Sequence, residues 1–283
     1  MPDDPLVSAE WLHEHLGDVR VKVLDASWYL PGDPRDPKAG YLDARIPGAM
    51  FFDIDEISDP DSHLPHMAPS PEQFAMQIGA LGIGSEDTVV VYDAVGVSSA
   101  PRAWWMFRLF GHGKVFVLDG GLPAWRDEGR PLEHGPPAPV SPGDFTVLTP
   151  HPELARSVED VRAALEGKDP QVVDVRPAVR FRGEAAEPRP GVRPGHMPGA
   201  MNLPMSDLVG PDGKLAAPAA LTELFRGAGV DVSRPIITSC GSGIAACVTA
   251  LALARLGHWD VAVYDGSWTE WGSRADTPVV AGP

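Results

Sequence analysis

The residue best placed to do chemistry in this chain is Cys240, which joins a short apolar run to a glycine-rich turn. The run Ile236–Ser239 is typical of a buried strand, and the alanine- and leucine-rich segment 246–255 is typical of a helix. The turn 241–243 reads Gly-Ser-Gly, so its backbone can fold tightly and direct several N–H groups toward one point at the start of that helix. A thiol beside such a ring of N–H groups ionises easily. The sequence therefore predicts that Cys240 is a nucleophile.

The second cysteine, Cys247, lies seven residues later, in the predicted helix, and is predicted to belong to the core. Two cysteines are too few for a disulfide framework, which fits a reducing compartment. Residues 1–5 are acidic and lack the apolar stretch of a signal peptide, and the uncharged run 235–254 is interrupted by the Gly-Ser-Gly turn. We therefore expect a cytoplasmic protein that does not enter a membrane.

The charge of the chain limits its partners. The formal net charge is −16, from 23 basic and 39 acidic side chains, which argues against nucleic acid and anionic membrane as partners. An anionic substrate would also be repelled, so its site must supply its own arginines. Five arginines fall within eighteen residues, namely Arg176, Arg180, Arg182, Arg189 and Arg193. The sequence has no metal-ligand cluster, no dinucleotide-binding glycine motif and no phosphate loop, so no cofactor and no metal are expected.

The chain contains one pattern twice. Four landmarks recur in the same order at offsets of 146 to 151 residues: 23–26 with 172–175, 46–50 with 197–201, 111–112 with 257–258, and 115–121 with 261–267. Short apolar strands alternate with helical patterns, as in the strands 21–24, 89–92 and 115–118 and the helix 103–110. This alternation predicts an α/β fold of two tandem domains, each a mostly parallel sheet flanked by helices. Sites in such sheets lie beyond the carboxyl ends of the strands, where Cys240 stands.

The repeat also predicts the domain boundaries and which half carries the nucleophile. The predicted boundaries are residues 1–133 for an N-terminal domain, 134–152 for a linker rich in proline and glycine, and 153–283 for a C-terminal domain. Asp93 occupies the place in the first half that Cys240 occupies in the second. Because a carboxylate cannot act as a thiolate, the N-terminal domain is predicted to lack a nucleophile and to serve as a wall of the site.

These features resemble the tandem-domain sulfurtransferases of the rhodanese superfamily, and within them the branch that uses 3-mercaptopyruvate. The resemblance covers almost the whole chain and rests on Cys-Gly-Ser-Gly-Ile-Ala-Ala at 240–246, Asp-Gly-Gly-Leu-Pro-Ala-Trp at 119–125, the paired Pro-Gly-Ala-Met turns and Arg-Phe-Arg-Gly at 180–183. In the thiosulfate-using branch the residues after the cysteine are typically basic, whereas residues 241–243 are neutral. A related phosphatase branch needs an arginine where this chain has Ala246.

The resemblance implies that Cys240 takes the sulfane sulfur of 3-mercaptopyruvate as a persulfide and releases pyruvate. The sulfur would then pass to a thiol, to cyanide or to thioredoxin. The loop residues that would contact the substrate, mainly through backbone N–H groups, are Gly241, Gly243, Ile244 and Ala245. Ile244 and Ala245 replace the Val-Thr pair usual in that loop, a change expected to matter little for backbone donors.

The resemblance also assigns two arginines and a proton relay. Arg180 and Arg189 have the nine-residue spacing of the family arginines that hold the substrate carboxylate, a role that suits the planar guanidinium. Ser242, His66 and Asp55 match a proposed Ser–His–Asp relay that would supply the proton needed by pyruvate enolate.

Several alternatives stay open at this point. The arginines could instead pair with Glu184, Glu187 and neighbouring acids as a surface network. A thiosulfate:cyanide sulfurtransferase would share the tandem fold, and a non-catalytic persulfide carrier would need the cysteine alone. The neutral loop favours 3-mercaptopyruvate over thiosulfate as the donor, and the arginine pair and the relay favour an enzyme over a carrier.

Overall fold

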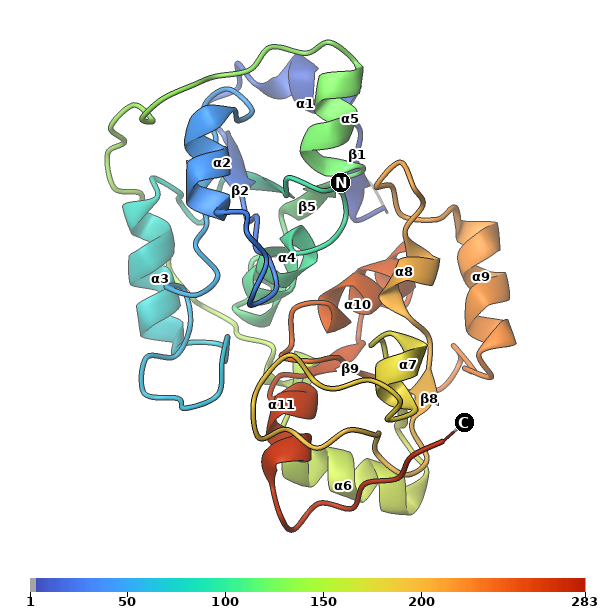
Figure 1. The fold of residues 1–283 in the computed structure, drawn as a ribbon. Helices are drawn as coiled ribbons and strands as arrows, with labels where there is room; N and C mark the ends of the chain where they lie inside the picture. The colour runs from blue at the N-terminus through green and yellow to red at the C-terminus, as the bar shows by residue number, and fades with distance from the viewer. Residues whose placement is uncertain (1–3, 283) are drawn as a thin grey trace. The chain divides into compact units, whose positions relative to one another are not determined.

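A computed structural model describes residues 4–282 and divides them into two compact units, which are described separately below (Figure 1). The first unit runs from residue 4 to Pro60 and includes Ala68–His151 and Pro211–Leu215. The second includes Asp61–Met67, Pro152–Gly210 and the chain from Ala216 to residue 282. Two short segments thus belong to the unit that is remote from them in sequence, and one of these carries His66.

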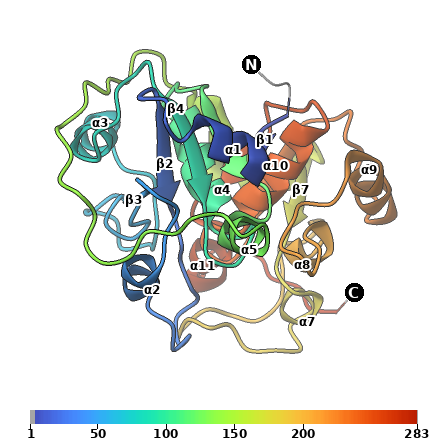
Figure 2. The ribbon, with the colours of Figure 1, turned by 90° about the horizontal axis from the view of Figure 1, so that it is seen from above.

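The first unit alternates strands and helices along the chain. Its elements are β1 (Leu6–Val7), α1 (Ala9–His15), β2 (Val21–Asp25), α2 (Pro37–Asp43), β3 (Met50–Phe51), α3 (Pro71–Ala80), β4 (Thr88–Tyr92), α4 (Ala100–Leu109), β5 (Val115–Leu118) and α5 (Gly121–Asp127). The strands lie in the order β1-β5-β4-β2-β3, and every pair is parallel. Figure 2 shows β2 and β4 side by side in this sheet.

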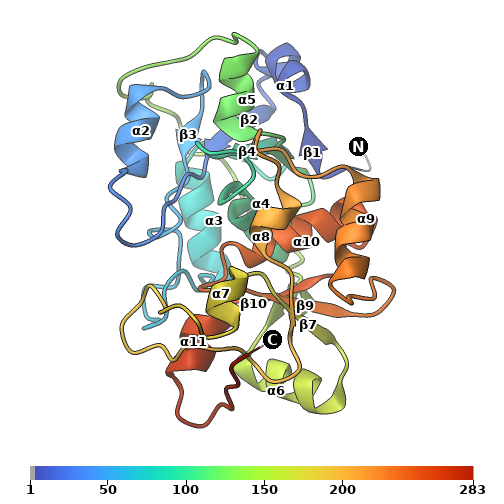
Figure 3. The same cartoon turned by 45° about the vertical axis from the view of Figure 1, so that its right-hand side comes forward.

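Helices cover both faces of the first sheet, where alternate strand residues point to opposite sides. On one face Val90, Tyr92 and Phe116 pack against α1 and α5, with Leu12 and Trp125 fully buried. Helix α4 packs against β4 and β5, and Figure 3 shows β4 between α5 and α4. Helix α3 begins with a proline at its first turn and a Ser70–Gln73 capping box, which explains why it starts where it does.

The second unit repeats this architecture. Its elements are a 3₁₀ turn (Pro152–Leu154), β6 (Ala155–Arg156), α6 (Val158–Gly167), β7 (Gln171–Asp174), α7 (Ala178–Phe181), β8 (Met201–Asn202), α8 (Met205–Leu208), α9 (Pro218–Gly227), β9 (Ile236–Ser239), α10 (Ala246–Arg255), β10 (Ala262–Tyr264) and α11 (Ser267–Ser273). The strand order β6-β10-β9-β7-β8 is that of the first sheet, and again every pair is parallel. Helices α6 and α11 pack on one face with Val172, Ile237 and Tyr264, and α10 packs against β9 and β10 (Figure 1).

The observed elements confirm the predicted fold class. The predicted strands at 21–24, 89–92 and 115–118 are β2, β4 and β5, and the strand predicted to end at Ser239 is β9. Cys247 is fully buried in α10, as predicted. Within residues 4–282 no helix combines the length and the apolar character needed to cross a bilayer.

The sheets bring the chemistry-bearing residues to one edge. In the second unit β9 ends immediately before Cys240, β7 ends at Asp174 and β10 ends at Tyr264. Since the three strands are parallel neighbours, the loops that follow them meet at the carboxyl edge of the sheet. Asp93 follows β4 in the same way in the first unit.

Candidate active site

Within residues 4–282, the loop after β9 leaves several backbone N–H groups without an acceptor in the segment that begins with Cys240. The Cys240 side chain is buried, with 3% of its surface exposed. Two loop N–H groups, those of Cys240 and Gly243, donate to the Ser267 hydroxyl. Five other N–H groups of the loop have no acceptor among the described residues, namely those of Gly241, Ser242, Ile244, Ala245 and Ala246. Three of these residues, Ser242, Ile244 and Ala246, are buried. Buried N–H groups are normally satisfied, so the set is consistent with a place that receives an anion.

The matching loop of the first unit shows what fills such a ring. There the Asp93 carboxylate, fully buried, accepts hydrogen bonds at 2.8–3.1 Å from five backbone N–H groups, those of Val95, Gly96, Ser98, Ser99 and Ala100. Burial raises the pKa of Asp93, while the backbone donors act in the opposite direction. The first unit therefore carries its own anion at the position where the second unit carries a thiol.

Ser267 is a site residue that the sequence did not reveal. Its Oγ accepts from the N–H groups of Cys240 at 3.1 Å and Gly243 at 3.2 Å, and donates to the Tyr264 carbonyl at 2.7 Å. It also lies 3.9 Å from the Cys240 Sγ, so the hydroxyl hydrogen has a second acceptor within reach. Ser267 has a φ of 49°, a left-handed conformation uncommon for residues other than glycine. The sequence repeat aligns Ser267 with Gly121, and a glycine at that position is the sequence signal for a left-handed backbone. The structure confirms the match, since Gly121 has a φ of 56°.

Replacing Ser267 with glycine tests this assignment. Glycine accepts the left-handed backbone without strain, so Ser267→Gly removes the hydroxyl while keeping the turn. Two buried N–H groups then lose their acceptor, at about 1–3 kcal/mol each. We expect kcat/KM for sulfur transfer to fall about 10- to 100-fold in steady-state assays, with the far-ultraviolet circular dichroism spectrum retained. A variant with wild-type kcat/KM would remove Ser267 from the site.

Arg180 lies against the loop and is held there by a buried acid. Its Nη2 lies 3.5 Å from where a Cβ on Gly241 would stand. Its Nε donates to Glu187 Oε1 at 3.3 Å, and its Nη2 donates to Glu187 Oε2. The Glu187 side chain is 4% exposed, so this pair is not the surface network that was the alternative from the sequence. Arg182 does pair on the surface, with Glu184.

The remaining arginines differ in role. Arg176 is buried and bonds Asp174, Glu187 and the Gly195 carbonyl. Arg193 donates to four backbone carbonyls, those of Gly272, Trp271, Arg274 and Thr277. Arg189 reaches His66, with Nη2 and the His66 Nε2 3.1 Å apart. Arg176 and Arg193 thus hold the fold, and Arg180 and Arg189 are the arginines beside the loop and the histidine.

Two of the three relay residues, His66 and Ser242, belong to the second unit, and Asp55 belongs to the first. His66 belongs to the second unit, is 93% buried and has a φ of 63°, so its conformation is held by its surroundings. Because arginine is always protonated, the contact with Arg189 makes the His66 Nε2 an acceptor. The Ser242 hydroxyl makes no hydrogen bond with any residue in 4–282, His66 included. Asp55 lies in the first unit, where its carboxylate accepts from the Trp28 Nε1 at 3.3 Å.

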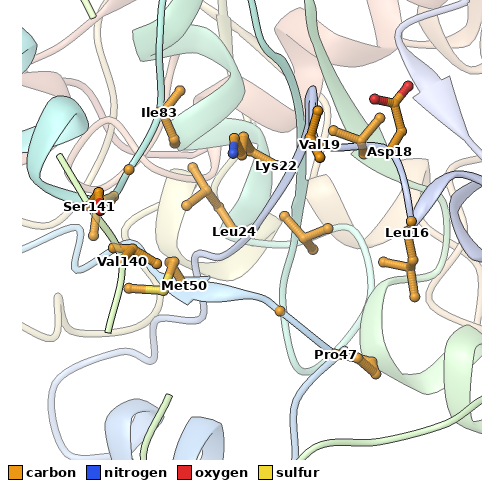
Figure 4. A pocket seen from close by; sticks show the side chains of 16 residues that line it. Leu16, Asp18, Val19, Lys22, Leu24, Pro47, Met50, Ile83, Val140 and Ser141 are labelled. Atoms are coloured by element: carbon orange, nitrogen blue, oxygen red, sulfur yellow. The ribbon is translucent and has the colours of Figure 1, made fainter. Parts of the chain in front are cut away.

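A cavity of about 470 Å³ lies in the first unit and is separate from these residues (Figure 4). Aliphatic side chains such as Leu24, Met50 and Val140 line it, with Lys22 and Asp18 as its charged members. None of its lining residues belongs to the loops that carry Asp93 or Cys240. Among the described residues, no three His, Cys, Asp or Glu side chains are grouped so that they could hold a metal ion.

Comparisons with known proteins agree with this geometry. The Rhodanese-like domain family matches residues 8–128 and 157–274. The 3-mercaptopyruvate sulfurtransferase of Escherichia coli K12 is 46% identical over 274 residues, which covers 96% of each chain. The human 3-mercaptopyruvate sulfurtransferase is 45% identical over 276 residues, covering 95% of this chain and 92% of the human one. The crystal structure of Escherichia coli SseA, described as a 3-mercaptopyruvate sulfotransferase, superposes with a TM-score of 0.86 at 43% identity, covering 94% of this chain and 99% of that one.

Proposed function

Because the chain belongs to the tandem rhodanese-domain sulfurtransferases, we propose that it transfers sulfane sulfur from 3-mercaptopyruvate through a persulfide on Cys240. The observation that carries this proposal is the contrast between the two loops. The first ring of N–H groups is closed by its own Asp93 carboxylate, and the second leaves five N–H groups beside a thiol. Such a ring stabilises both the attacking thiolate and the persulfide anion, since its dipoles are already oriented.

In the first half-reaction the donor is held by its carboxylate and loses its sulfur. The guanidinium groups of Arg180 and Arg189 bind the carboxylate. The Cys240 thiolate attacks the donor sulfur, forming the S–S bond as the donor's C–S bond breaks, and the electron pair of that bond passes to the carbon skeleton as pyruvate enolate. The enolate takes one proton and leaves as pyruvate.

Ser242, His66 and Asp55 are proposed to supply that proton. The Ser242 hydroxyl is two residues from the nucleophile, and its lack of a bond within the described residues leaves it able to turn toward the substrate. In this relay the His66 imidazole would exchange the proton with the Ser242 hydroxyl, and the Asp55 carboxylate would orient the imidazole.

In the second half-reaction a nucleophile removes the outer sulfur. It attacks that sulfur, the S–S bond breaks and the Cys240 thiolate is restored. A small thiol, cyanide and thioredoxin each offer a suitable nucleophile and are the proposed acceptors. We also propose the cytoplasm as the location, which suits two free cysteines; one relative from Arabidopsis thaliana, 43% identical over 297 residues, is named as mitochondrial.

The proposed domain roles follow from the two loops. Residues 1–133 would form a domain without a nucleophile, residues 134–152 a linker, and residues 153–283 the catalytic domain. The buried Asp93 supports the first of these roles, because a carboxylate that accepts five backbone hydrogen bonds cannot attack sulfur.

A comparison of donors tests the function. With cyanide or a thiol as acceptor, we expect kcat/KM for 3-mercaptopyruvate to exceed that for thiosulfate about 100-fold, or about 2.7 kcal/mol of transition-state discrimination. A preference for thiosulfate would establish the thiosulfate:cyanide sulfurtransferase instead. If Cys240 gains a sulfur atom but neither donor is turned over repeatedly, the protein is a persulfide carrier.

A further inference from the structure

A chain of four charged side chains, three of them buried and the fourth, Arg180, 15% exposed, leads from the second sheet to the active loop. Asp174, fully buried at the end of β7, accepts from Arg176 at 2.7–3.1 Å. The Arg176 Nη1 donates to Glu187 at 2.8 Å, and Glu187 in turn binds Arg180. Arg176 also stacks over the Trp268 ring at 4.2 Å. The four charges sum to zero, which is the condition for burying them together.

Within this chain only Arg180 is left with capacity for a substrate. All three guanidinium nitrogens of Arg176 are committed to Asp174, Glu187 and Gly195. Arg180 uses Nε and Nη2 on Glu187, and its Nη1 has no hydrogen-bond partner in the described part of the chain. The carboxylate of Glu187 therefore lies one guanidinium group away from the loop that faces the donor.

This position gives Glu187 an effect on the charge of the donor. A donor with one negative charge places it on Arg180 and Arg189. A dianion such as thiosulfate brings a second charge, which Arg180 cannot neutralise because Glu187 already neutralises it. With the Glu187 side chain 4% exposed, the repulsion is weakly screened by solvent and salt.

We propose that Glu187 is a specificity-determining residue that makes the site discriminate against dianionic sulfur donors in favour of monocarboxylates. The inference rests on the proposed function, because it takes Arg180 to bind the donor. This determinant lies outside the loop 240–246, on a segment where a surface network of arginines and acids was the open alternative from the sequence.

The charge-neutral variant Glu187→Gln tests the proposal. Glutamine keeps the length and one acceptor oxygen but removes the charge, so we expect the ratio of kcat/KM for thiosulfate to kcat/KM for 3-mercaptopyruvate to rise at least tenfold, about 1.4 kcal/mol. Competitive inhibition should move in the same direction, with sulfate binding more tightly and the monoanion pyruvate changing less. Glu184→Gln is the matched control, since that side chain is 55% exposed and pairs only with Arg182 among the residues described; its ratio should stay at the wild-type value.

The outcomes separate the inference from the function on which it rests. If the wild type turns over 3-mercaptopyruvate but Glu187→Gln loses rate equally with both donors, Glu187 only positions Arg180 and the inference is wrong. If the wild type uses neither donor, the proposed function fails and the inference fails with it.

The wild type provides a second test should Glu187→Gln not fold. It should bind the dianion malonate at least tenfold more weakly than the monoanion propionate, and the difference should persist in 0.5 M salt (roughly a 4 Å screening length). Discrimination that vanishes with salt would come from the surface charge of −16 and would overturn the proposal.

Discussion

Cys240→Ser should lower sulfur transfer below detection, by at least about 10³-fold in kcat. A hydroxyl in this loop is neutral at working pH and forms no persulfide, so the covalent route is lost altogether. The measurement is steady-state turnover with 3-mercaptopyruvate, together with intact mass spectrometry after incubation with the donor alone. The wild type should gain one sulfur atom on Cys240, and the variant none.

Cys247→Ala is the matched control for that experiment. Cys247 is fully buried in α10, where its Sγ donates to the Gly243 carbonyl at 3.2 Å. Its replacement should cost some stability through a small cavity and leave the sulfur gain at Cys240 unchanged. Persulfide on Cys247 in the Cys240→Ser background, with turnover retained, would mean that the nucleophile has been misassigned.

The second large effect is expected at the two arginines. Arg180→Ala and Arg189→Ala should each raise the KM for 3-mercaptopyruvate about 10- to 150-fold, since a hydrogen bond to a charged group contributes about 1.5–3 kcal/mol. Arg180→Ala should have the larger effect, because it also leaves the Glu187 carboxylate facing the donor. The KM of each variant is measured from initial rates over a wide range of donor concentration.

Arg182→Ala provides the comparison, since Arg182 lies two residues from Arg180 and pairs on the surface with Glu184. Its KM should match that of the wild type. If Arg180→Ala and Arg189→Ala also retain the wild-type KM, the donor carboxylate is bound elsewhere, and Glu187 does not determine donor specificity through Arg180.

The fold could be read from the sequence because its signals are local and repeated. The β-branched run at β4 and the apolar run at β9 each specify a strand, and the second copy of each landmark confirms the first. The loop that follows Cys240 could also be predicted from the sequence. Two glycines around a serine, between a strand and a helix, are typical of a tight turn and have no role in core packing.

The rest of the site depends on contacts that no local pattern encodes. Nothing in the sequence around Glu187 distinguishes it from a surface acid. The fold buries its side chain between Arg176 and Arg180. In the sequence Ser267 belongs to a Gly-Ser pair typical of a turn. Its hydrogen bond with Cys240 joins residues 27 positions apart, so no local pattern indicates it. The repeat places Asp93 at the position of the cysteine, but no sequence pattern indicates that N–H groups of its own loop bind the Asp93 carboxylate.

The hydrogen bonds between Asp93 and its own loop affect how the stability of each loop depends on dissolved ligands. The first loop is permanently saturated by a ligand that is part of the chain, so its free energy does not depend on what is dissolved around it. The second loop completes its hydrogen bonds only with a molecule from solution, so its stability rises with the logarithm of donor or product concentration. The duplication thus leaves one copy thermodynamically autonomous and the other coupled to the metabolite pool.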